Sequence, residues 1–401
     1  MHRPLLSVVI PTHNRAKYAK DCIRSLLSLE FDDRTMEVVV HDTSTNDELD
    51  AWLREDERSD GRLRYVHCYE PLDLTQNHNR ALSMATGRYI CLIGDDDTIL
   101  PGLISVAHFA EAFELDCVAP RVVANYAWPD FLSRTFGSAH AGRLYMAEQY
   151  GSAIKRFAAP ALEASLQRAA QGTDGLPKLY HGLVKMEVLQ GIRDKTGAFV
   201  HGASPDVSAA VAIAASIESF LELDFPVTLP GASGGSNTGA SAMGQHKGNL
   251  ATTRQTMRYA SAWPALIPGF YSVETVWAHA AYETLRLLEH PALEGFCYPA
   301  LYAQCLLRHR GEVEHTRSSM AHYSGLHSRD HFSTLLQTIT EAAKTTSREA
   351  LRLAVRALKP TAAGGRRYVG GISTVAEAQE EAIRIIQEDQ FDLVSILRQG
   401  V

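Results

Sequence analysis

The sequence predicts an α/β fold, with a parallel sheet covered by helices on both faces and a mostly helical C-terminal region after it. Short apolar runs alternate with amphipathic segments between residues 5 and 125, and the connections between them are short and polar. Three consecutive carboxylates, Asp95, Asp96 and Asp97, follow one of these runs. The chain has 401 residues, which is long enough for two domains.

The alternation can be followed element by element. Short apolar runs are typical of buried strands, and apolar positions three or four residues apart are typical of helices. The predicted strands are Leu5–Ile10, Glu37–Val40, Leu63–Tyr69, Tyr89–Ile93 and Cys117–Val123. The predicted helices between them are Ala16–Leu29, Glu48–Arg54, Thr75–Ala85 and Leu103–Phe113. Pro11 ends the first strand, and Gly87 ends the third helix.

Composition excludes several classes of protein. Hydrophobic residues make up 45% of the chain and charged residues 21%, as in an ordinary globular protein. The net charge of −7 argues against a broad nucleic-acid surface. The six cysteines have no paired spacing, which predicts reduced thiols in a cytoplasmic protein. We recognise no signal peptide and no apolar run long enough to span a bilayer, so we expect a soluble or peripheral protein.

The acidic triplet at residues 95–97 is the strongest functional feature of the sequence. It lies at the carboxyl end of the predicted strand Tyr89–Ile93, and open α/β sheets bind ligands outside the carboxyl ends of their strands. Adjacent carboxylates repel one another, and a hard divalent cation with oxygen ligands relieves that repulsion. A solvated acidic turn is the alternative, but the apolar strand before the triplet favours a binding edge.

Four motifs follow one another in the first part of the chain. The first is Ser-Val-Val-Ile-Pro-Thr-His-Asn-Arg at residues 7–15, and the second is Val-Val-Val-His-Asp-Thr-Ser-Thr-Asn-Asp at residues 38–47. The third covers residues 79–90, and the acidic triplet is the fourth. In this order they resemble the family 2 glycosyltransferases, clearly over residues 5–125 and more weakly to about residue 245. The resemblance implies a Rossmann-like GT-A fold.

The resemblance also implies which residues bind the donor, a nucleotide-sugar. Asp42 would hydrogen-bond the base ring, for which a carboxylate is a strong acceptor. An Asx-turn that ends the strand is the alternative for Asp42. The implied donor-binding residues are Pro11, Thr12, Arg15, Asp42, Asn79, Asp95 and Asp96. The sequence departs from the family pattern at His41 and Thr43, which replace an acid and a glycine and weaken the choice of uridine as the base.

The expected cofactor is Mn²⁺ or Mg²⁺. Gly94 stands where many family members carry the first acid of an Asp-x-Asp motif, so alignment on Pro101 makes Asp96 the expected metal ligand. Asp97 is expected to bind the metal directly or through water. His246 is a further candidate ligand, although a solvated histidine in a linker is the alternative.

A general base is expected at Asp206. The stretch Gly-Ala-Ser-Pro-Asp-Val at residues 202–207 precedes an apolar run. Ser204 is a predicted helix N-cap with Pro205 at the first helical position, so a purely structural role for Asp206 at the helix N-terminus is the alternative. The resemblance implies that the acid opening this helix removes the proton from the acceptor hydroxyl.

The remaining sequence predicts how the chain is divided. The Gly- and Ser-rich residues 236–250 are expected to form a flexible lid or linker between a GT-A domain of residues 1–235 and a helical domain of residues 251–401. A basic stretch that begins at Arg352–Lys359 is a candidate for a peripheral contact with anionic lipid, with a solvated helix end as the alternative. The terminal helices could also form a homodimer contact.

Together these observations predict a metal-dependent inverting glycosyltransferase. It would move a sugar from a nucleotide-diphosphate donor, with a UDP-sugar favoured, to a glycan or lipid-linked acceptor in bacterial surface polysaccharide synthesis. We expect a cytoplasmic location, in part peripheral at the inner face of the membrane. Two alternatives stay open: a degenerate GT-A domain that binds without catalysis, and a nucleotidyltransferase. The latter would carry a glycine-rich phosphate loop after the first strand, where this chain has Pro-Thr-His-Asn-Arg.

Overall fold

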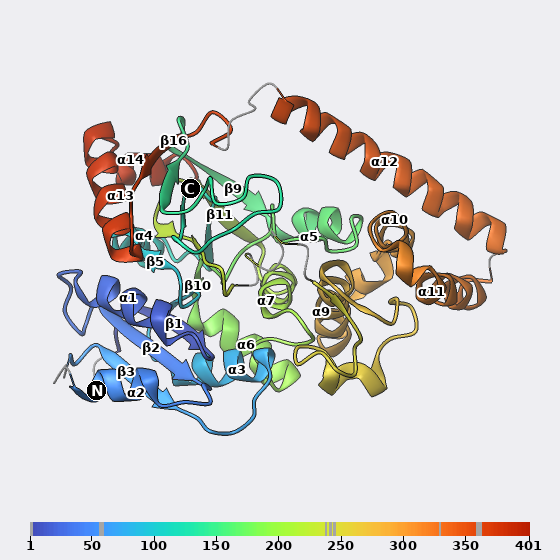
Figure 1. The fold of residues 1–401 in the computed structure, drawn as a ribbon, viewed down its shortest axis with the longest axis horizontal. Coiled ribbons are helices and arrows are strands. Elements are labelled where there is room, and N and C mark those ends of the chain that lie inside the picture. Colours follow the sequence, from blue (N-terminus) through green and yellow to red (C-terminus); the bar gives the residue numbers. More distant parts are fainter. Residues whose placement is uncertain are drawn as a thin grey trace.

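The structure is a computed structural model, and it describes residues 3–55, 60–236, 239, 243, 246–328, 330–357 and 363–401. Eight strands form the central sheet: β1 (Leu6–Thr12), β2 (Met36–Asp42), β3 (Leu63–His67), β4 (Tyr89–Leu92), β6 (Cys117–Pro120), β9 (Ser152–Phe157), β10 (Leu183–Lys185) and β11 (Ser219–Asp224). Their order across the sheet is β3-β2-β1-β4-β10-β6-β11-β9 (Figure 1). Strands β1 to β4 run parallel, and β10 enters antiparallel between β4 and β6.

Helices cover both faces of this sheet. Those of the first part of the chain are α1 (Ala16–Leu27), α2 (Glu48–Glu55), α3 (Leu74–Met84), α4 (Gly102–Ala112), α5 (Ala158–Leu166), α6 (Met186–Thr196) and α7 (Pro205–Ala214). Val8 and Val38 pack with α1 on one face, whereas Val9 and Val39 pack with α3 on the other. The predicted α/β fold is therefore confirmed. Every strand and helix predicted between residues 5 and 125 is present, with ends shifted by a few residues at most.

Smaller sheets flank the central one within the described residues. β5 (Thr98–Ile99) pairs with β12 (Thr228–Leu229), and β14 (Lys247–Gly248) pairs with β15 (Tyr271–Ser272). A four-stranded sheet joins β13 (Gly231–Ala232), β7 (Ala124–Ala127), β8 (Arg143–Met146) and β16 (Arg367–Gly370), in that order. The sequence does not predict these strands, because such short segments carry too little periodic pattern. These short strands hold the chain around residue 231 beside the acidic triplet.

The second half of the chain is mostly helical, as predicted. Its helices before residue 360 are η1 (Met257–Ala262), α9 (Val273–Leu287), η2 (Pro291–Gly295), α10 (Tyr298–Arg308), η3 (Arg310–Glu312), α11 (Val313–Leu326) and α12 (His331–Ala357). Buried aromatic residues such as Phe270, Tyr298 and Tyr302 form their core. Helix α9 packs against α7 and so joins this part to the sheet. Within the described residues, no helix combines the length and apolar character needed to cross a membrane.

The last segment of the chain returns to the sheet domain (Figure 1). Strand β16 pairs with β8, helix α13 (Val375–Asp389) packs against α1, and helix α14 (Leu393–Arg398) packs against α4. The side chain of Gln379 donates hydrogen bonds to Thr98 Oγ1 at 3.1 Å and to the Ile99 carbonyl at 2.8 Å. The expected division of the chain at residues 236–250 stays a prediction, and these contacts add residues 367–398 to the core of the first part.

Candidate active site

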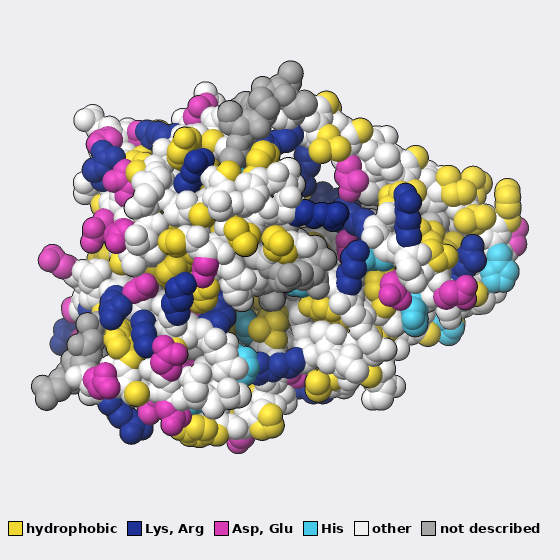
Figure 2. Space-filling model, viewed as in Figure 1, with side chains coloured by type: hydrophobic (Ala, Val, Ile, Leu, Met, Phe, Trp, Pro, Cys, Tyr) yellow, Lys and Arg dark blue, Asp and Glu magenta, His cyan; other side chains and the backbone are white. Residues whose placement is uncertain are grey.

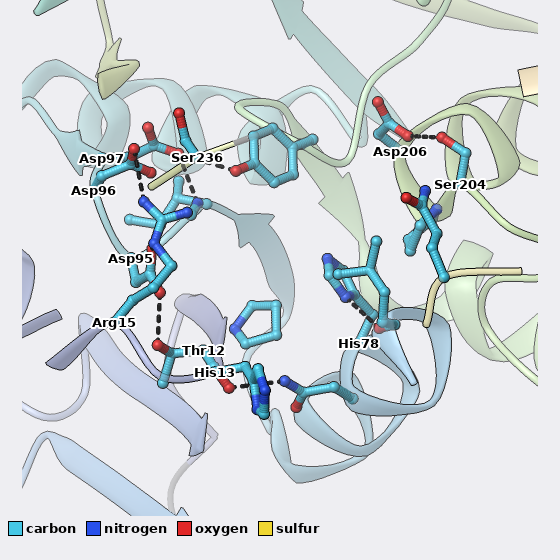
Figure 3. A pocket seen from close by; sticks show the side chains of 18 of the residues that line it. Thr12, His13, Arg15, His78, Asp95, Asp96, Asp97, Ser204, Asp206 and Ser236 are labelled. Carbon is cyan, nitrogen blue, oxygen red and sulfur yellow. Dashed lines mark hydrogen bonds and ion pairs between the residues drawn. The ribbon is translucent and has the colours of Figure 1, made fainter. Parts of the chain in front are cut away.

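A cavity of about 680 Å³ opens at the carboxyl ends of β1 and β4 (Figure 3). Its walls come from parts that are far apart in the sequence: the turn after β1, the triplet after β4, the start of α7 and residues between 246 and 277. The predicted site residues that line it are Pro11, Thr12, Arg15, Asp95, Asp96, Asp97, Asp206 and His246. The structure therefore brings most of the predicted site together.

Arg15 supplies the countercharge for the first two carboxylates. Its Nε atom lies 3.1 Å from Asp95 Oδ1, and its Nη2 atom lies 2.9 Å from Asp96 Oδ2. Thr12 donates its hydroxyl proton to Asp95 Oδ2 at 2.6 Å. Burial raises the pKa of Asp95 against the opposing effect of Arg15. Burial and the neighbouring Asp97 charge raise the pKa of Asp96. Both acids thus depend on a nearby cation for their ionised state.

Within the described part of the chain, side-chain contacts to Asp96 are made through one carboxylate oxygen. Besides Arg15, Oδ2 accepts hydrogen bonds from the Ser233 backbone N–H at 3.2 Å and the Ser233 hydroxyl at 2.6 Å. The Trp128 indole N–H donates to the Asp96 carbonyl at 2.9 Å and fixes the backbone. Oδ1 accepts no hydrogen bond from the described residues, which leaves one oxygen of a well-oriented carboxylate for a ligand in the cavity.

The Asp97 carboxylate, in contrast, is engaged at both oxygens. Oδ1 accepts the Gly231 backbone N–H at 2.6 Å, and Oδ2 accepts the Gly94 backbone N–H at 2.6 Å and the Tyr180 hydroxyl at 3.2 Å. His181 Nε2 lies 3.1 Å from Oδ2. Burial would raise the pKa of Asp97, but His181 and the two backbone N–H groups lower it. These contacts favour a structural role for Asp97, and its role as a metal ligand stays a prediction.

Two glycines make this close packing sterically possible. A Cβ atom at Gly231 would lie 1.8 Å from the Asp96 carbonyl oxygen. A Cβ atom at Gly94 would lie 2.5 Å from the Tyr180 hydroxyl and 2.9 Å from Asp97 Oδ2. No side chain fits at either position. This explains why Gly94 stands where the family pattern has an acid: the space for that acid is taken by Tyr180.

Asp206 lies across the cavity from the acidic triplet, in the first turn of α7 (Figure 3). Ser204 is the N-cap residue and Pro205 follows it, as predicted. The Ser204 hydroxyl, however, hydrogen-bonds Asp206 Oδ1 and not a backbone N–H group of the helix. Burial lowers the pKa of nearby His78, which is therefore a neutral neighbour at pH 7. A carboxylate oriented in this way can accept a proton from a hydroxyl group in the cavity.

Two predicted donor-binding residues do not line the cavity. Asp42 is completely buried, and its Oδ1 accepts the Ser44 backbone N–H at 2.8 Å while its Oδ2 accepts the Tyr65 hydroxyl at 3.1 Å. This is the Asx-turn named above as the alternative. The Asn79 side chain donates to the Val200 carbonyl at 2.9 Å and accepts the Val200 N–H at 3.1 Å. Both side chains stabilise the surrounding structure through these hydrogen bonds, and their role in donor binding stays a prediction.

Several cavity residues were missed by the sequence analysis. On the donor side, Asn77 donates its amide N–H to the Thr12 carbonyl at 2.9 Å. Asn77 precedes the buried Ala81 by one helical turn, so its place on the inner face of the helix was a usable signal. Arg254 donates to the Leu72 carbonyl at 2.8 Å and adds a second arginine to the wall. No local pattern marks it, because it follows the Gly- and Ser-rich stretch.

An apolar wall faces the Asp206 side of the cavity. It is formed by Tyr271, Val273, Val276 and Trp277, at and just after β15. Val276 and Trp277 lie on α9, where they pack with Ala203 and Leu250, and both also line the cavity.

The expected lid is only partly covered by the structure. Of residues 236–250, the described ones are 236, 239, 243 and 246–250. His246 lines the cavity, and its ring centroid lies 6.0 Å from that of Tyr271. Burial lowers the pKa of His246, which favours the neutral imidazole that metals require. Its role as a metal ligand stays a prediction.

The residues of the cavity fit a metal ion that is shared with a bound nucleotide. Among the described residues, no group of three or more His, Cys, Asp or Glu side chains is arranged to hold a metal. A Mg²⁺ or Mn²⁺ ion bound to phosphates needs only one or two carboxylates, because phosphate oxygens and waters complete its shell. The free Oδ1 atom of Asp96 meets that requirement, whereas a site built from protein ligands alone is not present in the described residues.

The comparisons with known proteins agree with the predicted fold class. The family model described as glycosyl transferase family 2 matches residues 7–152, which include the β1 turn, the acidic triplet and their supporting strands. This part of the chain is therefore similar to glycosyl transferase family 2. The recognition made from the motifs is therefore confirmed.

Named relatives share the same N-terminal part. A GalNAc(5)-diNAcBac-PP-undecaprenol beta-1,3-glucosyltransferase of Campylobacter jejuni is 29% identical over 103 residues, which is 25% of this chain and 33% of that protein. The putative teichuronic acid biosynthesis glycosyltransferase TuaG of Bacillus subtilis is 33% identical over 95 residues, covering 24% and 37%. The putative colanic acid biosynthesis glycosyl transferase WcaA of Escherichia coli is 32% identical over 106 residues, covering 26% and 37%. The chain thus spans only about a third of the length of these relatives.

A solved structure of S. aureus TarS 1-349 in complex with UDP-GlcNAc aligns with 81% of this chain and 92% of its own, at 13% identity and a TM-score of 0.44. A TM-score at this level carries no inference about this chain.

Proposed function

We propose that the protein is an inverting glycosyltransferase that takes a sugar from a nucleotide-diphosphate donor, with UDP-sugars favoured, and transfers it to a hydroxyl of a glycan or lipid-linked acceptor. The observation that carries this proposal is the placement of Asp96 and Asp206 on opposite sides of one cavity, in a chain that is similar to family 2 over residues 7–152. The named relatives support a place in bacterial surface polysaccharide synthesis.

The part of the cavity that we assign to the donor is lined by Thr12, Arg15 and Asp96. Arg15 opposes the burial that raises the pKa of Asp95 and Asp96, and Asp96 is the residue that would hold a divalent cation bound with the donor. Such a divalent ion supplies charge neutralisation for the diphosphate leaving group. Arg254 adds a protein cation to the wall. Positive charge thus holds the diphosphate of the donor in a part of the cavity whose other charged side chains are acidic.

The part of the cavity that we assign to the acceptor is lined by Asp206 and the apolar wall. Asp206 accepts the proton of the acceptor hydroxyl as its oxygen attacks the anomeric carbon of the donor sugar. The bond from that carbon to the diphosphate oxygen breaks, and the nucleoside diphosphate leaves with the bonding electrons. Attack from the side opposite the leaving group inverts the anomeric configuration. Trp277 offers an aromatic surface for the ring of a sugar acceptor.

The experiment that tests the proposal has two stages. Thermal unfolding is first measured with UDP, GDP, CDP and dTDP, each with Mn²⁺, Mg²⁺ or EDTA, because a ligand of the folded state raises the melting temperature. We expect UDP to raise it only when a metal is present, and Asp96→Asn to lose that rise. Release of UDP from UDP-sugars is then assayed in the wild type and in Asp206→Asn. A chain that responds to no nucleotide would instead be a non-catalytic GT-A domain.

A further inference from the structure

Arginine side chains gather beside one face of the small sheet that contains β8 and β16. Tyr145 lies opposite Tyr368 in the register of these two strands, and Arg143 lies opposite Gly370. Directly opposed residues project from the same face of a sheet, and so do residues two apart on one strand. The other face of this sheet packs against α13. Figure 2 shows Lys and Arg side chains on the part of the surface where β16 and the end of α12 lie in Figure 1.

Two of these arginines lie over tyrosine rings. The Cζ atom of Arg143 is 4.5 Å from the ring centroid of Tyr368, and that of Arg366 is 4.5 Å from the ring centroid of Tyr145. The two tyrosine rings are themselves only 5.9 Å apart. A guanidinium stacks through its flat side, so its N–H groups, which point outward in its plane, stay available to another partner.

A third arginine reaches this group from the end of α12. The Cζ atom of Arg356 lies 5.3 Å from the ring centroid of Phe136, in the connection between β7 and β8. His140, in the same connection, lies edge-on to Phe136 at 5.5 Å and to Tyr145 at 5.7 Å, and so links the arginines. A Cβ atom at Gly364 would lie 3.0 Å from Arg356 Nη1, so the turn before β16 passes close to this arginine.

The hydrogen-bonding capacity of Arg143 and Arg366 is used only in part. Arg366 donates to two neutral oxygens, Asn125 Oδ1 at 2.6 Å and the Ala363 carbonyl at 3.4 Å. Within the described part of the chain, Arg143 stacks on its tyrosine and donates no hydrogen bond. Neither arginine forms an ion pair with a carboxylate of the described residues. Both therefore keep N–H donors for a ligand.

The charges of this group act on one another. Burial lowers the pKa of His140, and the charges of Arg366, Arg143 and Arg356 lower it further. Burial also lowers the pKa of Arg366 against the opposing effect of Tyr145, and the charge of Arg356 adds to the lowering. An anion placed among the guanidinium groups relieves this repulsion. The local excess of cations is notable in a chain whose net charge is −7.

The neighbouring Arg367 shows the opposite arrangement. It is the first residue of β16, and it forms an ion pair of 2.6 Å with Asp389 of α13, on the other face of the sheet. The arginine on the inner face is thus neutralised by the protein, whereas Arg143 and Arg366 are not.

We propose that Arg143, Arg356 and Arg366 form a binding site for the phosphate groups of a ligand, either a soluble phosphate or diphosphate or the headgroup of a phospholipid. None of the three lines the cavity that we assign to sugar transfer, so this is a second site. The fork of a guanidinium matches two phosphate oxygens, and a diphosphate has enough oxygens and charge for several guanidinium groups at once. The aromatic rings hold the arginines in place, which lowers the entropy lost on binding.

The first test is calorimetric titration of the full chain with pyrophosphate at low salt. EDTA is present, so that metal-dependent binding in the active-site cavity does not contribute. We expect a Kd below about 1 mM, weakened by added NaCl. Acetate at the same ionic strength should bind much more weakly, because one carboxylate has fewer oxygens and less charge.

Three variants locate the site. Arg143→Gln/Arg366→Gln should weaken pyrophosphate binding more than about tenfold. Arg143→Gln alone should weaken it less, and it is the variant least able to disturb the fold, because Arg143 donates no hydrogen bond to the described residues. Arg367→Gln is the matched control: it removes the same charge one residue away, on the other face, and should bind pyrophosphate like the wild type. Circular dichroism and the melting temperature establish that each variant is folded.

Flotation with vesicles distinguishes the two sources of phosphate. The vesicles contain phosphatidylcholine alone or with about a third of phosphatidylglycerol. Flotation with the anionic vesicles that pyrophosphate competes away identifies a lipid headgroup, whereas pyrophosphate binding without flotation identifies a soluble ligand. A wild type that binds neither would overturn the proposal. So would folded arginine variants that bind as the wild type does, or an equal loss in Arg367→Gln. None of these readouts depends on sugar transfer, so they separate this inference from the proposed function.

Discussion

Arg15 and Asp96 form an ion pair of 2.9 Å in which the carboxylate is only 6% exposed. The pair occupies one carboxylate oxygen, and the other accepts no hydrogen bond from the residues that the structure describes. Arg15 also contacts Asp95, so one guanidinium compensates two buried acids. Burial would lower the pKa of Arg15, but the two acids raise it. The arginine is therefore a permanent cation that orients the proposed metal ligand.

Replacing Arg15 by glutamine should destabilise the protein in a pH-dependent way. Removing one partner of a buried ion pair costs about 3–5 kcal/mol of unfolding free energy. The pKa values of Asp95 and Asp96 are already raised in the folded state, and the loss of Arg15 raises them further. Carboxyls with a raised pKa bind more protons in the folded state, so stability falls as pH rises above about 4. Urea unfolding should show a larger loss for Arg15→Gln at pH 8 than at pH 5, and Arg15→Lys should reduce that difference.

Restoring the family acid at position 94 should damage the protein. A Cβ atom at Gly94 would lie 2.5 Å from the Tyr180 hydroxyl, so Gly94→Asp must displace Tyr180 and the Asp97 carboxylate. We expect a loss of more than about 3 kcal/mol in unfolding free energy, together with loss of nucleotide binding. Gly191→Ala is the matched control, because nothing lies within 4 Å of its added Cβ in helix α6. That control should be neutral or stabilising by about 0.5–1 kcal/mol. A folded Gly94→Asp protein with normal binding would contradict the packing described here.

The sequence predicted those parts of the site that follow strands or open helices. Asp96 lies a few residues after a buried strand and Asp206 lies in the first turn after the N-cap Ser204, so local pattern placed both at element ends. Side-chain direction is harder to predict: Asp42 ends a strand at the correct edge, yet it turns into the protein and binds Ser44. Trp277 could not be assigned to the cavity, because its place there depends on packing of α9 against α7. Arg254 could not be assigned because it reaches the cavity through a contact with Leu72, which is far away in the sequence.

The packing of the last residues of the chain could not be predicted from local pattern either. Amphipathic pattern predicted α13 and α14 correctly as helices. It could not show where their apolar faces pack, and the structure places Val375 and Ile385 against the sheet formed by β7 and β8. Strand β16 has only four residues, two of them arginines, and carries no strand signal of its own.

The contacts that hold the start of α9 in place should weaken at low pH. Glu274 is buried at the start of α9, with His309 Nε2 at 2.7 Å and Arg308 Nη1 at 2.9 Å. Burial would raise the pKa of Glu274, but these partners lower it to about 2. A depressed carboxyl pKa contributes stability that is complete above the unfolded pKa of about 4.3 and is lost as pH falls toward 2. The unfolding free energy of Glu274→Gln should be lower by about 3 kcal/mol at pH 7. Below pH 4 it should fall less steeply than that of the wild type, as measured by urea unfolding.

Trp277 should affect the acceptor and not the donor. The indole lines the half of the cavity that holds Asp206, and aromatic surfaces add about 0.5–1.5 kcal/mol to a contact beyond area burial. Trp277→Ala should therefore raise KM for a sugar acceptor about tenfold, while Trp277→Phe should have a smaller effect. KM for the nucleotide-sugar should stay at the wild-type value in both. An equal rise in both KM values would instead indicate that Trp277 stabilises the fold and does not contact the acceptor.

Asp206→Asn should slow transfer strongly while the donor still binds. The asparagine keeps the size of the carboxylate but cannot accept a proton, and general-base catalysis contributes about 10²–10⁴-fold. We expect kcat to fall within that range, with the metal-dependent rise in melting temperature caused by UDP unchanged. Ser204→Ala is the matched control, because it removes only the hydroxyl that bonds Asp206 Oδ1. It should lower kcat by less than about tenfold. If Asp206→Asn kept its transfer rate, the carboxylate would be a helix N-terminal residue with no part in the chemistry.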